Sequence, residues 1–147
     1  FQVGLINLAL SFIGAKAPEA LLKAADSDVA EVRVAAISAL GDQIQKGDNL
    51  RAQNRVFQAL EDVSADVRAE AVTLIGKSCD AEDVETLLLK KLSDEDTQVR
   101  KNTALSLMKL DAIGSIQQLK IAEQKEDDPD VKAVIRVAIN ILSAKII

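Results

Sequence analysis

The sequence contains no histidine, tryptophan or tyrosine, and it has only three phenylalanines, two prolines and one cysteine. Without histidine, the chain has no histidine-based triad, no imidazole proton shuttle and no histidine ligand for a metal. Its six glycines are scattered, so it has no glycine-rich phosphate-binding loop. A lone cysteine forms no internal disulfide, which favours a reducing compartment such as the cytoplasm or a plastid stroma. We therefore expect no catalytic residue, cofactor or metal, and a chain that is not an enzyme.

The acidic balance of the chain argues against nucleic acid as a partner. Asp and Glu total 23 against 18 Lys and Arg, which gives a formal net charge of −5. Proteins that bind nucleic acid usually carry a basic surplus and stacking aromatics, and this chain has neither. The apolar run at 3–13 is shorter than the roughly 20 residues that a membrane span requires, so we interpret it as a buried helix. Protein partners are expected instead, without a transmembrane segment.

Four segments share one pattern, in which an acidic turn is followed by Val, a basic residue directly after it, and an Ala-rich apolar run. They are 28–41, 62–76, 94–107 and 128–139. The basic residues are Arg33, Arg68, Arg100 and Lys132, at spacings of 35, 32 and 32 residues. Apolar residues recur one position before each basic residue and three and seven positions after it, with Thr103 as the one polar exception. This spacing places them on one face of a helix, and the long period indicates stacked helical layers.

Each repeat is predicted to be a pair of antiparallel helices. Asp residues of the turn can cap the free backbone amides of the longer helix, and Gly41 and Gly76 stand where two of these helices are expected to stop. The shorter helices are predicted at 18–25, 49–61, 81–92 and 114–125. Together with an unpaired first helix in the N-terminal apolar run, the sequence predicts nine helices and no strands.

Two further features look like sites but are interpreted as structural. The acidic residues at 123–130 lack the spacing and the glycine of a calcium-binding loop, so we interpret them as solvated carboxylates that cap a helix. Cys79 stands in a predicted loop, and only Lys77 nearby would lower the pKa of its thiol. We interpret it as an ordinary loop thiol.

The repeat resembles a known family. The pattern Asp-x-Asp-x-x-Val-Arg-x-x-x-Ala-x-x-Leu at 94–107 resembles the HEAT-like repeat named after phycobilisome (bilin) lyases, a class that also includes scaffolds without a lyase role. The resemblance covers nearly the whole chain. It implies an all-α fold, an α-solenoid of about four and a half repeats with a right-handed superhelix. The expected domain is a single solenoid over 1–147 that belongs to a longer repeat array.

The resemblance also implies a ladder of Asp–Arg pairs between neighbouring repeats. Its predicted members are Asp28, Arg33, Asp62, Arg68, Asp94 and Arg100. The first copy departs from the pattern, because Asp28 lies five residues before its arginine rather than six. The fourth has Lys132 as its basic residue and Glu126 at the six-residue offset. Since a catalytic group occurs once and these pairs recur, we interpret them as structural.

Two functions remain open from the sequence. The first is a non-catalytic scaffold that binds a partner protein through its concave inner-helix face or its uncapped, apolar ends, as a subunit docked in a larger assembly. The alternative, implied by the resemblance, is a phycobiliprotein bilin lyase or a lyase-like chaperone subunit. Positions one and five residues after each basic residue point away from the buried stripe. The residues expected to bind the partner are Asn7, Ser11, Val34, Ser38, Thr73, Lys101, Leu105, Met108, Val137 and Ile141.

Overall fold

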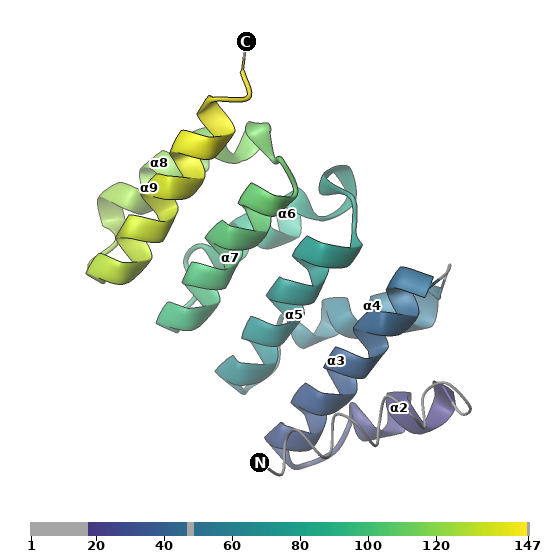
Figure 1. Cartoon of the computed structure of the whole chain (residues 1–147). Coiled ribbons are helices and arrows are strands. Elements are labelled where there is room, and N and C mark those ends of the chain that lie inside the picture. The colour runs from purple at the N-terminus through teal and green to yellow at the C-terminus, as the bar shows by residue number, and fades with distance from the viewer. Residues whose placement is uncertain (1–17, 47–48, 147) are drawn as a thin grey trace. The chain divides into compact units, whose positions relative to one another are not determined.

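The computed structural model describes residues 18–46 and 49–146, and this part of the chain contains helices and no strands (Figure 1). The elements are α2 (Pro18–Ala24), α3 (Ala30–Lys46), α4 (Leu50–Ala59), α5 (Ala65–Ser78), α6 (Ala81–Lys91), α7 (Thr97–Lys109), the 3₁₀ helix η1 (Ile113–Ser115), α8 (Ile116–Lys125) and α9 (Pro129–Ser143). They form the helical hairpins of an all-α solenoid, as predicted. The first of the nine predicted helices lies outside the described residues. The four shorter helices begin and end within two residues of their predicted bounds.

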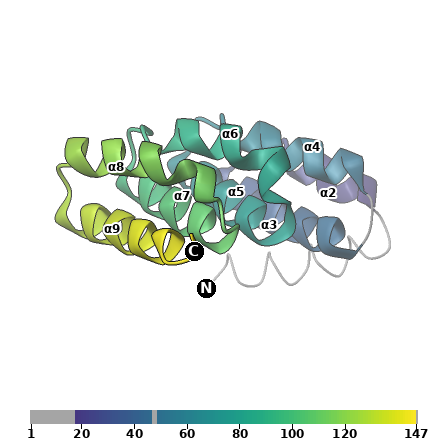
Figure 2. The same ribbon diagram turned by 90° about the horizontal axis from the view of Figure 1, so that it is seen from above.

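The chain divides into two compact units, 1–74 and 75–147, and each is described on its own. In the N-terminal unit, α3 packs against both α2 and α4. In the C-terminal unit, α6 and α8 form one layer, while α7 and α9 lie side by side in the other (Figure 2). The expectation of a single solenoid domain stays a prediction.

The core is aliphatic, in keeping with the near absence of aromatics. Every buried apolar side chain in the described ranges is Ala, Val, Leu or Ile. The largest in the N-terminal unit are Leu21, Ile37, Leu40, Val56, Val67 and Val72, and the largest in the C-terminal unit are Ile75, Leu88, Leu107, Leu119, Ile135 and Leu142. Small and branched side chains let neighbouring helices pack closely in layer after layer. No helix of 18–46 or 49–146 is long and apolar enough to cross a membrane.

Carboxylates in the turns explain where the long helices begin. The Asp96 side chain accepts hydrogen bonds from the amides of Gln98 and Val99, at 2.9 and 3.1 Å. The Asp128 side chain does the same for Asp130 and Val131, at 2.9 and 3.0 Å. Each cap satisfies two amides that have no partner within the helix. The acidic residues at 123–130 therefore include a helix cap, as the sequence indicates.

Gly41 and Gly76 do not end their helices, and this part of the sequence interpretation is wrong. α3 continues to Lys46 and α5 to Ser78. The two glycines instead allow close packing. A Cβ atom at Gly41 would lie 2.6 Å from Cδ2 of Leu74, and one at Gly76 would lie 2.4 Å from Oγ of Ser106. Local pattern alone does not distinguish a glycine that ends a helix from one that admits a neighbouring helix.

Candidate functional site

Arg33 joins two successive repeats of the N-terminal unit. Its Nε and Nη2 atoms each donate a hydrogen bond of 3.0 Å to the carboxylate of Asp62, and its Nη1 donates to the carbonyl of Ser27 at 2.9 Å. Burial would raise the pKa of Asp62, but the hydrogen bonds from Arg33 and from the Ser64 amide outweigh burial and lower it. The pair is therefore ionised and bidentate.

Arg100 makes the same connection in the C-terminal unit, but to a glutamate. Its Nε and Nη2 donate to the two carboxylate oxygens of Glu126 at 2.8 and 2.9 Å, and its Nη1 donates to the carbonyls of Asp94 and Glu95. The hydrogen bonds from Arg100 are the main cause of a lowered pKa at Glu126. The six-residue offset thus matters more than the residue type, because Glu126 takes the place of an aspartate in this repeat.

Asp28 is not the acidic residue that the first repeat uses, and its place in the predicted ladder is wrong. It is exposed, and no described residue donates a hydrogen bond to its carboxylate. The residue six positions before Arg33 is Ser27, whose Oγ accepts from the amide of Val29 at 3.1 Å. Asp62 and Asp94 make the equivalent contact with the amides of Ser64 and Asp96. Counting back six residues, which locates Glu126 in the fourth repeat, would also have found Ser27 in the first.

Arg68 and Asp94 complete the predicted ladder residues. Arg68 is buried, with 7% of its surface exposed. Its Nη1 donates a hydrogen bond of 2.8 Å to the backbone carbonyl of Asp62. The carbonyl of Asp94 accepts from Arg100. Both bonds go to backbone carbonyls of the turns that precede α5 and α7.

The predicted partner-binding residues of the N-terminal unit are half-buried. Val34 and Ser38 lie on α3, and Thr73 lies on α5, where its hydroxyl donates to the carbonyl of Ala69 at 3.1 Å. Their side chains are partly accessible but present little apolar surface. Asn7 and Ser11 lie outside the described residues.

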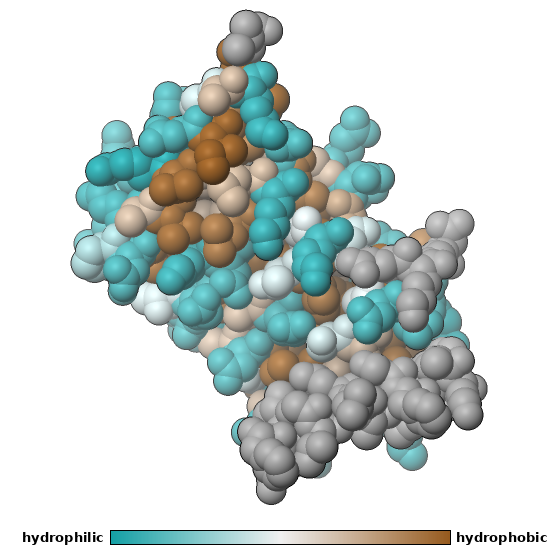
Figure 3. Space-filling view, viewed as in Figure 1, coloured by the Kyte–Doolittle hydropathy of each residue, from teal (hydrophilic) through white to brown (hydrophobic). Residues whose placement is uncertain are grey.

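The predicted partner-binding residues of the C-terminal unit share one face, formed by α7 and α9. We call these five residues the α7–α9 surface: Lys101, Leu105, Met108, Val137 and Ile141. The three on α7 are half-buried, whereas Val137 and Ile141 on α9 are 50% and 40% exposed. Figure 3 shows hydrophobic side chains gathered over α9 and towards α7. This is the most apolar exposed surface that the sequence-predicted residues form.

A groove on the other layer of the C-terminal unit was not predicted. It has a volume of about 460 Å³. Its lining includes Leu89, Leu92, Arg100, Ile121 and Lys125. Arg100 and Glu126 form an ion pair in this lining, so the charge of Arg100 is neutralised within the protein. The signal that could have located it is the ladder itself, since the groove lies beside the Arg100–Glu126 pair.

No other chemistry is assembled in the described part of the chain. Across 18–46 and 49–146, no three His, Cys, Asp or Glu residues come together in a way that could hold a metal ion. The pKa of the Cys79 thiol is raised by burial and by the carboxylates of Asp83 and Asp80. The thiolate is the reactive form of cysteine, so this environment makes Cys79 a poor nucleophile.

Comparison with known proteins identifies a relative that is named for a role in bilin biosynthesis. Over 140 residues, the chain is 48% identical to the bilin biosynthesis protein MpeU of Synechococcus sp. (strain WH8020); the match covers 95% of this chain and 47% of that protein. The chain therefore spans about half the length of this curated relative. The predicted resemblance to the HEAT-like repeats of bilin lyases is confirmed. The expectation that the chain is not an enzyme is corrected, because its relative is named for a biosynthetic role.

The fold and the family are supported by two other comparisons. The crystal structure of an engineered protein matches with a TM-score of 0.60 and 20% identity, over 94% of this chain and 67% of that one, and so supports the solenoid fold. The family model for HEAT repeats matches residues 54–140, which include both Arg68 and Arg100 with their turns. The chain belongs to the HEAT-repeat family.

Proposed function

We propose that this chain is the HEAT-repeat part of a protein of bilin biosynthesis, acting as a phycobiliprotein bilin lyase or as a lyase-like chaperone subunit. One observation carries the proposal, the 48% identity to a protein named for bilin biosynthesis over 95% of the chain. The repeats themselves suggest protein binding, because stacked helical hairpins expose extended surfaces for partners.

The described residues support a holding role for this part of the protein. The most exposed group of predicted binding residues, on α7 and α9, is apolar and basic rather than nucleophilic. Cys79 is half-buried with a raised thiol pKa. We infer that the chain contributes to bilin attachment by binding the protein substrate and keeping it in place. In the N-terminal unit, the residues proposed to bind the partner are Val34, Ser38 and Thr73.

Mixing experiments test this function. The chain is mixed with an open-chain bilin, with and without a phycobiliprotein subunit that lacks its chromophore. We expect a shift in the visible absorption of the bilin, and more bilin that stays attached to the phycobiliprotein after denaturation. A spectral shift without attachment would favour the chaperone role. The same mixtures with urea-unfolded chain serve as the control, and an identical spectrum and yield in both would contradict the proposal.

A further inference from the structure

The packing of the long helices identifies which of their positions face the next repeat. Eight residues after the basic residue stand Gly41 in α3 and Gly76 in α5, where an added Cβ would lie 2.6 Å from Leu74 and 2.4 Å from Ser106. Four residues after it, Ile37 and Ala104 are fully buried. The fourth and eighth positions therefore form the stacking side of the long helices, and Met108, the eighth position of α7, is half-buried on that side at the edge of the α7–α9 surface.

On α9 the stacking side is polar, and the apolar stripe lies elsewhere. The fourth and eighth positions after Lys132 are Arg136 and Asn140, both exposed. Val137 and Ile141 occupy the fifth and ninth positions. Their apolar surface is consequently not the surface that a stacked repeat would use.

The same positions in earlier repeats show whether stacking covers this side. At the ninth position, Asp42, Lys77 and Lys109 are all exposed, although each of their helices is followed by another repeat. At the fifth position, Leu105 stays half-buried beside α9 rather than fully buried. Stacking therefore leaves this side accessible, and the apolar side chains of α9 require a different explanation.

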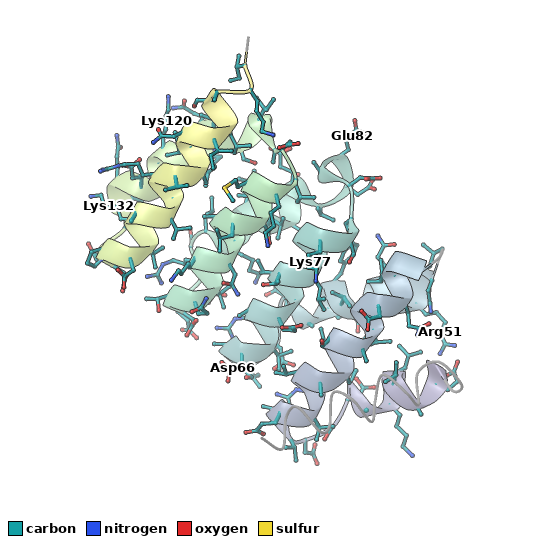
Figure 4. The ribbon with its side chains drawn as sticks, in the orientation of Figure 1. Arg51, Asp66, Lys77, Glu82, Lys120 and Lys132 are labelled. Carbon is teal, nitrogen blue, oxygen red and sulfur yellow. The ribbon has the colours of Figure 1, made fainter. Side chains whose placement is uncertain are left out.

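The unpaired charge of α7 and α9 is basic, opposite in sign to the net charge of −5 of the chain. Of the five basic residues on these helices, Arg100 is paired with Glu126 and Arg136 with Glu123, which leaves three lysines against Asp130. Lys101 and Lys109 on α7 and Lys77 near the end of α5 have no carboxylate within ion-pair distance among the described residues. Figure 4 labels Lys77 on α5 and Lys132 near the start of α9. An apolar stripe bordered by unpaired lysines complements an acidic, amphipathic ligand.

We propose that the α7–α9 surface binds an amphipathic helix of a partner protein that carries acidic residues beside its apolar stripe. The apolar side chains of that helix contact Val137 and Ile141, which are one helical turn apart, and reach Leu105 and Met108 between the two helices. Its carboxylates pair with Lys101 and Lys109. Helices that dock in this way use anchors spaced three, four and seven residues apart. The flexible Met108 side chain suits an adaptable contact.

Two other occupants fit this surface less well. A second copy of the chain using the same surface would bring lysines against lysines, which costs binding energy. A membrane surface is usually met by exposed aromatics and a broad apolar face, whereas the described part of α7 and α9 contains no aromatic residue and half of the apolar set is recessed. The inference concerns the chemistry of the partner helix and does not depend on the bilin chemistry proposed above.

A pair of designed peptides tests the proposal. One helix-forming peptide of about 16 residues, long enough to hold several turns, carries leucines at helical spacing flanked by glutamates; the second has lysines in place of the glutamates. Binding to the chain is followed by fluorescence anisotropy at low and high salt. We expect the glutamate peptide to bind, the affinity to fall as salt rises, and the lysine peptide not to bind.

Matched variants locate the binding surface. V137D/I141D and, separately, K101E/K109E are expected to weaken binding of the glutamate peptide about tenfold or more, as for the central residues of an interface. V63D, at a position that is 93% exposed in the N-terminal unit, and K90E, on the exposed side of α6, are the controls and should bind normally. Circular dichroism checks that each variant is folded.

The following outcomes overturn the proposal. The glutamate peptide fails to bind the unmodified chain, or the lysine peptide binds equally well. V63D or K90E weakens binding of the glutamate peptide as much as the surface variants do. The chain binds phosphatidylserine vesicles but not the peptide. Should V137D/I141D unfold, the charge-reversal variant K101E/K109E decides, because those side chains are not part of the buried core. These readouts contain no bilin, so failure here and failure of the proposed function are distinguishable.

Discussion

The arginine near the start of a long helix performs two structural tasks with one side chain. In Arg33 and Arg100, two guanidinium nitrogens bind a carboxylate of the following repeat, and the third donates to backbone carbonyls of the turn that precedes the arginine's own helix. Only arginine offers enough fixed donors for both contacts at once. A lysine at this position, as in Lys132, cannot make the same bidentate pair.

Loss of this arginine should destabilise the protein. Arg100→Ala is expected to lower the free energy of unfolding by about 1–3 kcal/mol, because it removes the two guanidinium hydrogen bonds of Glu126, whose side chain is only 4% exposed. Urea denaturation followed by circular dichroism measures the change. Arg51→Ala is the control, since Arg51 pairs with Glu19 on the open surface and its loss should leave the midpoint unchanged. Equal midpoints for Arg100→Ala and the unmodified chain would contradict the role of the ladder.

The Glu126 carboxylate should also make stability depend on pH. Hydrogen bonds from Arg100 lower its pKa in the folded chain from the ordinary value of 4.5. A lowered folded pKa contributes stability above the unfolded pKa, and this contribution is lost as the pH falls through the folded pKa. The stability difference between the unmodified chain and Glu126→Gln should therefore be largest near neutral pH and shrink below pH 4.5. Urea unfolding over a pH series measures it, and a difference that stays constant would disprove the linkage.

At the scale of elements, the packing of the long helices depends on glycine as much as on large apolar residues. Gly41 and Gly76 lie inside α3 and α5, where glycine is normally unfavourable by about 1 kcal/mol relative to alanine. An added Cβ at Gly76 would meet the backbone of Ser106 at 2.9 Å, and one at Gly41 would meet the side chain of Leu74 at 2.6 Å. The close approach offsets the cost in helix propensity.

Gly76→Ala should therefore destabilise the protein, although alanine favours helices. The new Cβ would lie 2.9 Å from the backbone Cα of Ser106, and overpacking of this kind typically costs about 1–3 kcal/mol. Gly114→Ala is the matched control, because its Cβ would meet only the movable carboxylate of Glu85 at 2.9 Å. Thermal melts of both variants give the comparison. A melting temperature for Gly76→Ala at or above that of the unmodified chain would show that the helices can move apart.

At the scale of the whole molecule, the polarity of the stacking positions bears on self-association, because apolar stacking sides allow repeats to pack on one another. Arg136 and Asn140 make the stacking positions of α9 polar, and Arg136 pairs with Glu123 at 2.7 Å. The sequence of α9 is apolar except for a narrow polar stripe, and the packing places Arg136 and Asn140 of that stripe at the stacking positions, beside the exposed Val137 and Ile141.

Replacing that polarity should promote self-association. R136L/N140L is expected to form larger species with rising concentration in sedimentation velocity, because it recreates an apolar stacking side like that of Ile37 and Ala104. E82L/K90L adds the same apolar bulk on the exposed side of α6 (Figure 4) and should remain unchanged in size. If both double variants associate equally, apolar surface in general, rather than the stacking side of α9, is responsible.

The sequence by itself determined the repeat, the helical class and the bounds of the four shorter helices to within two residues. Apolar residues recur at helical spacing, and the carboxylates of Asp96 and Asp128 accept hydrogen bonds from amides two residues later. Because both features involve residues close in the sequence, they can be recognised without the structure. The acidic residue that pairs with the preceding repeat lies six positions before the basic residue of its own repeat. This short spacing can be read from the sequence, and it locates Glu126 without knowledge of its partner Arg100.

Only the tertiary structure decided the matters that depend on a second helix. Whether Gly76 ends a helix or admits Ser106 depends on a distance between segments 30 residues apart. The choice of Ser27 over Asp28 depends on which of two adjacent residues turns its side chain back to the amide of Val29. The two sides of α9 differ by one residue in register, about 100° around the helix. That rotation separates Arg136 from Val137, and so the polar stacking side of α9 from its exposed apolar side.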